Sequence, residues 1–233
     1  KNQSKDKFKI LTIPNQYPFK IIKKKKLIIG FDPKLHTELS LKRFFQKTNC
    51  KLRPVKNNLV EAIKKQRKKI YYNKFFKLDE RFTGQNSTKK ITKILKILIK
   101  NKVDAQFISS SENIAWLLNI RGNDSKFSPL PNGYLIIDRK KNVNLFCNLK
   151  KIDKKLRKKL KDKKINDISS IEQFLKNIRH KKIQVDKISC SIYFKNLLQK
   201  ENNIIKKYNT IYFLKSIKNK IEIKNTIKAH ITD

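Results

Sequence analysis

The chain has 233 residues, enough for one large or two small domains, and its 59 Lys and Arg against 18 Asp and Glu give a net charge of +41. Such a charge is typical of proteins that bind nucleic acid or another polyanion. However, 51 of the basic residues are lysines, and Ile and Asn are also abundant. This composition is what an AT-rich genome encodes, whereas nucleic-acid readers favour arginine. Composition therefore favours genome bias over dedicated nucleic-acid binding.

Cysteines and apolar runs indicate the compartment. Cys50, Cys147 and Cys190 are odd in number and widely spaced, without a metal-site or paired pattern, so we expect reduced cysteines in a cytoplasmic protein. No apolar run approaches the roughly 18 residues of a membrane span, and we expect no membrane partner. The sequence lacks methionine and ends inside a predicted helix, so we also expect a fragment.

The first 69 residues alternate short apolar runs with amphipathic patterns. We predict strands over 8–13, 27–30 and 50–55, a helix after Thr37, which can cap it, and a second helix over 58–69. Alternation of strands and helices is typical of an α/β fold. The aromatic residues of 70–86 are expected to pack a linker against a domain.

The rest of the chain continues the same alternation. The clearest helix covers 87–102, with an apolar stripe at helical spacing and Ser87 or Thr88 as its cap. A strand over 105–109 and a short helix around Trp116 follow. Further helices are predicted over 151–163, 171–178, 191–200 and from 218 onward, and further extended segments over 134–137, 142–147, 165–168, 183–186 and 204–211.

Residues 119–132 form a long polar loop between the helix around Trp116 and the next strand. It contains Arg121, Asp124, Pro129 and Pro131. A loop of this length in a compact domain is usually functional or disordered. Arg121 has two interpretations: an ion pair with Asp124 that fixes the loop, or a contact with a peptide carboxylate or carbonyl, for which a guanidinium is suited.

Three segments in the same order resemble one enzyme family. N-I-A-W-L-L-N-I-R-G-N-D at 113–124, I-G-F-D-P-K-L-H-T at 29–37 and L-K-S-I-K-N-K-I-E at 214–222 resemble three-domain Xaa-Pro aminopeptidases of the creatinase and prolidase group, which have a pita-bread catalytic domain. The resemblance implies the end of a first domain over 1–78, a second domain over 79–216, and the first helix of a catalytic domain over 217–233. Both lobes are then creatinase N-terminal-domain-like α/β folds, with mixed sheets flanked by helices.

The resemblance also implies a chemistry. Enzymes of this family remove the residue that precedes proline, using two divalent metals, which we expect to be manganese, held by two aspartates, a histidine and two glutamates of the catalytic domain. The three histidines here, His36, His180 and His230, lie in different segments without metal-ligand spacing. We therefore expect this polypeptide alone to hold no metal, to have no catalytic residue and to be inactive.

The resemblance implies partners as well: a proline-containing peptide, bound through the catalytic domain, and a second subunit in a homodimer. Related loops lie at the active-site mouth or the dimer interface, which makes Trp116, Arg121 and Asp124 the candidate site residues. The alternative functions are a lysine-rich protein that binds nucleic acid or another polyanion nonspecifically, and a catalytically inactive interaction module.

Overall fold

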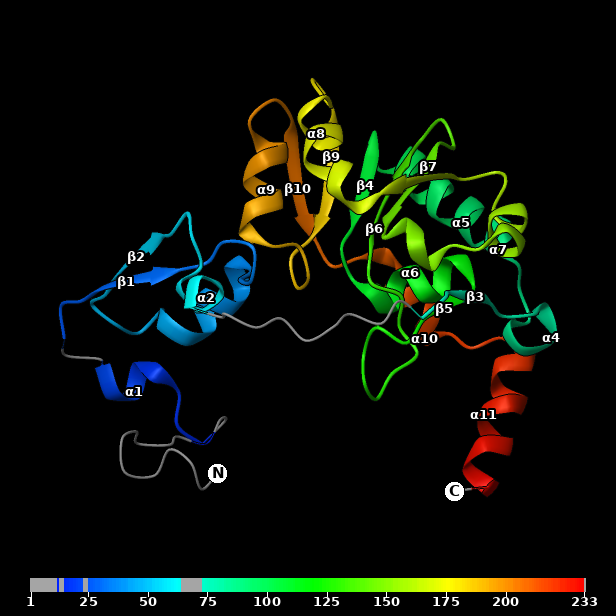
Figure 1. Cartoon of the computed structure of the whole chain (residues 1–233), viewed down its shortest axis with the longest axis horizontal. Coiled ribbons are helices and arrows are strands. Elements are labelled where there is room, and N and C mark those ends of the chain that lie inside the picture. The colour runs from blue at the N-terminus through cyan, green and yellow to red at the C-terminus, as the bar shows by residue number, and fades with distance from the viewer. Residues whose placement is uncertain (1–11, 13–14, 23–24, 64–72, 233) are drawn as a thin grey trace. The chain divides into compact units, whose positions relative to one another are not determined.

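The computed structural model describes residues 12, 15–22, 25–63 and 73–232. The predicted strand over 8–13, except Thr12, and the end of the predicted helix over 58–69 lie outside the described residues. The chain divides into two compact units, Lys1–Gln66 and Arg67–Asp233 (Figure 1).

The first unit is a small α/β unit. Its elements are α1 (Pro18–Ile22), β1 (Ile28–Phe31), α2 (Glu38–Phe45), β2 (Lys51–Pro54) and α3 (Leu59–Ile63). β1 and β2 pair in parallel, with α2 between them in the chain. Thr37 caps α2 as predicted: its Oγ1 accepts from Ser40 N at 3.1 Å, while Ser40 Oγ accepts from Thr37 N at 3.0 Å.

The second unit is built on a mixed six-stranded sheet, which confirms the predicted fold class. In sheet order the strands are β10 (Asn203–Lys207), β9 (Lys182–Asp186), β4 (Ala105–Ile108), β6 (Tyr134–Asp138), β7 (Val143–Cys147) and β8 (Lys164–Asp167). β10, β9 and β4 run parallel, as do β7 and β8, whereas β6 is antiparallel to both of its neighbours.

Helices cover both faces of this sheet, and a cluster of buried side chains packs the helices against the sheet on each face. One face carries α5 (Ser87–Lys100), α6 (Ser111–Leu118), α7 (Lys154–Lys159) and α10 (Thr210–Ser216), and the other α8 (Ile171–Lys176) and α9 (Ile192–Gln199). Adjacent residues of β4 divide between the clusters: Ile108 packs with the first group and Phe107 with the second. This alternation is what a strand buried on both faces requires.

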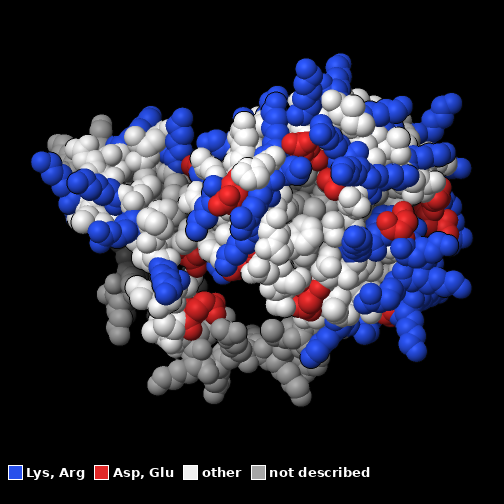
Figure 2. All heavy atoms as spheres, turned by 90° about the horizontal axis from the view of Figure 1, so that it is seen from above, with Lys and Arg blue, Asp and Glu red and all other residues white. Residues whose placement is uncertain are grey.

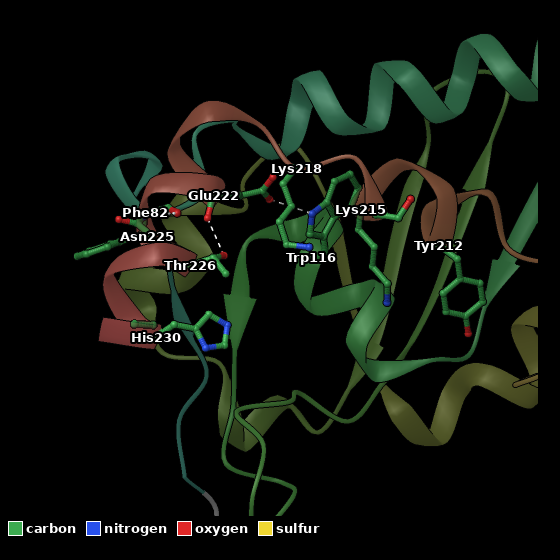
Figure 3. A pocket seen from close by; sticks show the side chains of 11 residues that line it. Phe82, Trp116, Tyr212, Lys215, Lys218, Glu222, Asn225, Thr226 and His230 are labelled. Atoms are coloured by element: carbon green, nitrogen blue, oxygen red, sulfur yellow. Dashed lines mark hydrogen bonds between the residues drawn. The ribbon is translucent and has the colours of Figure 1, made fainter. Parts of the chain in front are cut away.

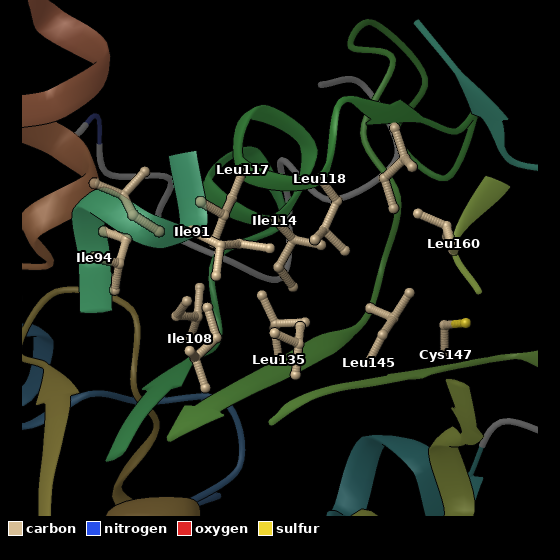
Figure 4. Packing of buried hydrophobic residues seen from close by; sticks show 14 of the residues in the cluster. Ile91, Ile94, Ile108, Ile114, Leu117, Leu118, Leu135, Leu145, Cys147 and Leu160 are labelled. Carbon is tan, nitrogen blue, oxygen red and sulfur yellow. The ribbon is translucent and has the colours of Figure 1, made fainter. Parts of the chain in front are cut away.

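The first cluster is the larger core, and α5 supplies one side of it (Figure 4). Ile91, Ile94, Leu95 and Leu98 are buried in it, as their helical spacing predicts. The cap of this helix differs from the prediction. Asn86 occupies the N-cap and its side chain accepts from Lys89 N, because an Asn amide oxygen one residue earlier already satisfies the free N–H of the first turn.

Other differences arise from capping. The segment predicted as extended over 204–211 ends as a strand at Lys207, since Asn209 Oδ1 accepts from Ile211 N at 3.0 Å and starts α10. The predicted helix over 151–163 is reduced to α7, preceded by a 3₁₀ turn, η1 (Leu149–Lys151), and a similar turn, η2 (Ile168–Ser170), precedes α8. The short α4 (Glu80–Thr83) was not predicted; it ends at Gly84, whose φ is +65°.

Two short strands tie the start of the second unit to the predicted loop. β3 (Phe76–Lys77) pairs antiparallel with β5 (Ile120–Arg121), so the segment over 119–132 begins as a strand, not as a loop. Phe75 is buried in the larger core, as expected of an aromatic residue that packs a linker against a domain, whereas Phe76 is 47% exposed. Tyr71 and Tyr72, which share this prediction, lie outside the described residues. The last element is α11 (Lys220–Thr232), which packs against α4. No helix of the described residues has the length and apolarity to cross a bilayer.

Candidate functional site

Arg121 stabilises the turn that follows α6. Its Nη1 donates to the carbonyl oxygens of Ala115, at 3.0 Å, and Ile120, at 2.9 Å. Burial lowers the pKa of Arg121 from its ordinary value. The guanidinium thus donates hydrogen bonds to carbonyl oxygens at the carboxyl end of α6, where the helix dipole favours a positive charge. The two residues considered as an ion pair, Arg121 and Asp124, have different partners in the described structure.

Asp124 anchors the loop to the core instead. One carboxylate oxygen forms an ion pair with the Lys151 ammonium, and the other accepts from Asn132 N at 2.7 Å. The side chains of Asp124 and Lys151 are only 5% and 12% exposed. Since the bond to Asn132 joins the two ends of the loop, Asp124 fixes its base. Phe127, near the tip, is 88% exposed.

Trp116, the third candidate residue, lines a pocket of about 670 Å³ between the sheet domain and α11 (Figure 3). Further walls come from Phe82 of α4, Tyr212 and Lys215 of α10, and His230 of α11. The pocket therefore combines aromatic surface with the charged side chains of Lys215, Lys218 and Glu222.

Glu222 of α11 links that helix to Trp116. Trp116 Nε1 donates to Glu222 Oε1 at 3.3 Å, and Asn219 N donates to Glu222 Oε2 at 2.9 Å. Asn219 Oδ1 in turn accepts from Glu222 N at 3.0 Å, which completes a capping box at the start of α11. Two of the resembling segments, 113–124 and 214–222, thus meet in space.

Lys90 of α5 lies under Trp116 and is only 1% exposed. Its ammonium donates to Trp116 O at 2.9 Å and to Asn119 Oδ1 at 2.7 Å, and lies 4.2 Å from the centroid of the Trp116 ring. Burial lowers the pKa of Lys90 to about 8, although the nearby charge of Glu222 raises it. A sequence signal for this burial was missed: Lys90 lies one turn before Ile94, within the apolar stripe of α5.

A second polar network holds α10 beside the pocket. Tyr212 Oη donates to Asp186 Oδ2 at 3.0 Å, and Lys215 Nζ donates to Asn113 Oδ1 at 2.9 Å. Burial raises the pKa of Tyr212 to about 12 and lowers that of Lys215, while the carboxylates of Glu112 and Asp186 raise the Lys215 value. These groups orient α10.

A dinuclear metal centre requires a cluster of carboxylate and imidazole ligands. Across residues 12, 15–22, 25–63 and 73–232, no group of three or more His, Cys, Asp or Glu side chains is placed to hold a metal ion. The side chains of the described residues therefore do not fit such a centre.

Comparison with known proteins gives a consistent family. The sequence model of the Creatinase/Prolidase N-terminal domain matches residues 66–222. Xaa-Pro aminopeptidase 1 of Dictyostelium discoideum is 35% identical over 164 residues, which cover 69% of this chain and 26% of that protein. Xaa-Pro aminopeptidase ApepP of Drosophila melanogaster is 28% identical over 221 residues, covering 88% and 35%.

A solved structure shares the fold. The X-prolyl aminopeptidase of Caenorhabditis elegans, described as a cytosolic enzyme with a di-nuclear active site, superposes with a TM-score of 0.75 and 22% identity over 84% of this chain and 34% of its own. The chain thus spans about a quarter to a third of the length of these relatives. It belongs to the creatinase/prolidase N-terminal domain family and is a homologue of the Xaa-Pro aminopeptidases.

Proposed function

We propose that this chain is the non-catalytic N-terminal region of a metal-dependent Xaa-Pro aminopeptidase, a hydrolase that removes the N-terminal residue preceding proline. The observation that carries the proposal is the 35% identity with the Dictyostelium enzyme over 164 residues, all within 26% of that enzyme's length. On this proposal, residues 1–78 end a first domain, 79–216 form the second, and 217–233 begin the catalytic domain, which holds two manganese ions. The complete protein is a cytoplasmic homodimer.

The experiment compares two purified proteins, residues 1–233 and the complete protein encoded by the gene, on a peptide with proline at its second position. We expect manganese-dependent release of the first residue by the complete protein and none by residues 1–233. Release by residues 1–233 alone, or inactivity of the metal-loaded complete protein, contradicts the proposal.

Within this function, the segment over 119–132 is proposed to face either the active-site mouth or the second subunit. Its anchored base and the exposed Phe127 suit a contact that requires one fixed shape. Arg121→Ala in the complete protein separates the two roles, with metal content unchanged in both. Loss of one charge-assisted hydrogen bond costs roughly 1.5–3 kcal/mol. This corresponds to a change of about tenfold or more in the turnover, the substrate affinity or the dimerisation constant. A mouth role lowers turnover or substrate affinity with the dimer intact, and an interface role weakens dimerisation.

If Arg121→Ala changes neither turnover, substrate affinity nor dimerisation, the segment only stabilises the fold of its own domain, and both proposed roles are wrong. Kinetics and sedimentation velocity provide the measurements. Lys126→Ala, a substitution near the loop tip that leaves the Asp124 anchor in place, is the matched control for removal of one cation.

A second function, nonspecific polyanion binding, is favoured by the net charge of +41. Figure 2 shows Lys and Arg side chains spread over the visible face with acidic and uncharged surface between them. A dispersed charge of this kind supports weak, salt-sensitive association rather than a built site. Retention of the protein on heparin at low salt and its release near physiological salt is the expected behaviour. Tight, salt-resistant binding to one nucleic-acid sequence would favour the alternative function over the aminopeptidase.

A further inference from the structure

The contacts of Trp116 belong to a closed ring of hydrogen bonds. The ring has six members, which come from α5, α6, the residues that end α4 and α6, and the start of α11. In order they are Lys90, Trp116, Glu222, Asn219, Thr83 and Asn119. Each joins the next by a hydrogen bond from a side chain or the backbone, and Asn119 returns to Lys90.

The side of the ring nearest the chain's last helix is formed by Asn219. Its Nδ2 donates to Thr83 O at 2.9 Å, while its Oδ1 accepts from the backbone of the first turn of α11. One side chain therefore caps α11 and ties it to α4. Asn225 Nδ2 adds a second link, donating to Phe82 O at 3.1 Å.

Gly84 leaves the space that this link needs. Its φ of +65° is in the left-handed region, and a Cβ placed on it would lie 2.3 Å from Asn219 Oδ1. Asn119, with φ of +55°, closes the opposite side: its Nδ2 donates to Thr83 Oγ1 at 3.2 Å and to Gln85 O at 2.8 Å. The left-handed backbone conformations of Gly84, after α4, and Asn119, after α6, thus turn the chain so that α4, α6 and α11 approach one another.

We propose that this ring is a positioning device, in which Lys90, Asn219 and Glu222 hold α11 at a fixed angle to the second domain. α11 has no buried residue among its described positions, so apolar packing contributes little to its placement. Specific hydrogen bonds therefore carry the orientation. Lys90 acts indirectly, because its ammonium donates hydrogen bonds to Trp116 and Asn119 and so fixes their positions. Glu222 and Asn219 act directly on the helix.

A consequence for the complete protein rests on the proposed function. The family match ends at residue 222, inside α11, and α11 is proposed as the first helix of the catalytic domain. The ring then sets the angle between the second domain and the catalytic domain. Asn219→Ala in the complete protein is expected to lower kcat while metal content stays at the wild-type value.

The protein offers a direct readout, because Trp116 is its only tryptophan. In residues 1–233, selective excitation of Trp116 reports on the surroundings of this one indole. We expect Glu222→Ala and Asn219→Ala each to shift the emission maximum to longer wavelength and to speed quenching by acrylamide. Glu222→Gln, which keeps an oxygen to accept from the indole, restores most of the wild-type emission. Lys224→Ala, at an exposed position of α11, is the matched control and leaves the emission unchanged.

The outcomes separate the two claims. If Glu222→Ala and Asn219→Ala match Lys224→Ala in emission and quenching while remaining folded by circular dichroism, the ring does not hold α11 and the inference is wrong. If one Ala variant unfolds, the other decides by the same comparison: emission shifted relative to Lys224→Ala supports the ring, and emission equal to that of Lys224→Ala contradicts it. Inactivity of the wild-type complete protein refutes the proposed function and leaves the fluorescence result standing.

Discussion

Removing the buried charge of Lys90 should change how stability depends on pH. In the folded protein burial lowers the pKa of Lys90 to about 8, whereas the unfolded chain restores the ordinary value of 10.5. The side chain is 1% exposed, so solvent screens this effect little. The difference between the two pKa values corresponds to about 3 kcal/mol of free energy of unfolding.

The sign follows from proton binding. Below about pH 8 the Lys90 amine is protonated in both the folded and unfolded states, and the group contributes no pH dependence. Between about 8 and 10.5 the unfolded state binds more protons, so the contribution of Lys90 to the free energy of unfolding rises with pH. Cys147 acts in the opposite direction, since burial raises its pKa to about 12 from 9.0. A variant at Lys90 must therefore be compared with wild type at each pH.

Urea denaturation of the wild type and Lys90→Met from pH 7 to pH 10 tests this reasoning. Methionine has a similar length without charge, and the contribution of Cys147 cancels in the difference. We expect the stability of the wild type relative to Lys90→Met to increase across this range by up to about 3 kcal/mol. Lys89→Met, at an exposed neighbouring position, is the control for removal of one lysine side chain from α5. A constant difference for Lys90→Met would refute the burial of a charged ammonium.

Three further predictions follow from single contacts. Asp124→Ala leaves the Lys151 ammonium buried without its partner and should cost about 3–5 kcal/mol of unfolding free energy in urea denaturation; a loss below about 1 kcal/mol, as for an exposed ion pair, would contradict the burial of this pair. Ile94→Ala removes a fully buried side chain from the larger core, and about 2–5 kcal/mol should be lost in the same assay; a loss below about 1 kcal/mol would contradict the packing. Gly84→Ala should destabilise the protein and red-shift Trp116 emission because its new Cβ meets Asn219; unchanged emission would contradict that approach.

The sequence predicted the parts of the fold that depend on local patterns. The apolar stripe of α5 and the alternation of strands and helices from residue 105 to 200 appear in the structure, because hydrophobic spacing is a property of each segment. Short elements such as α4 and β5 were not predicted. β5 exists only through its pairing with β3, more than 40 residues away in the chain, and such a partner leaves no local pattern.

The site was predicted less completely than the fold. Trp116, Arg121 and Asp124 were chosen from a resembling segment, but the partners that the structure gives them, Glu222 and Lys151 among others, come from distant segments. A capping box between Asn219 and Glu222 was readable from their spacing of three. Its tie to Trp116 was not, since that contact depends on how α11 packs beside α6.

The proposed function is tested most directly by the nucleotide sequence that follows the codon for Asp233. We expect the open reading frame to continue into a catalytic domain that contains two aspartates, a histidine and two glutamates able to hold two metal ions. A stop codon at this position, or a continuation without these ligands, would contradict the assignment of this chain to a metal-dependent aminopeptidase.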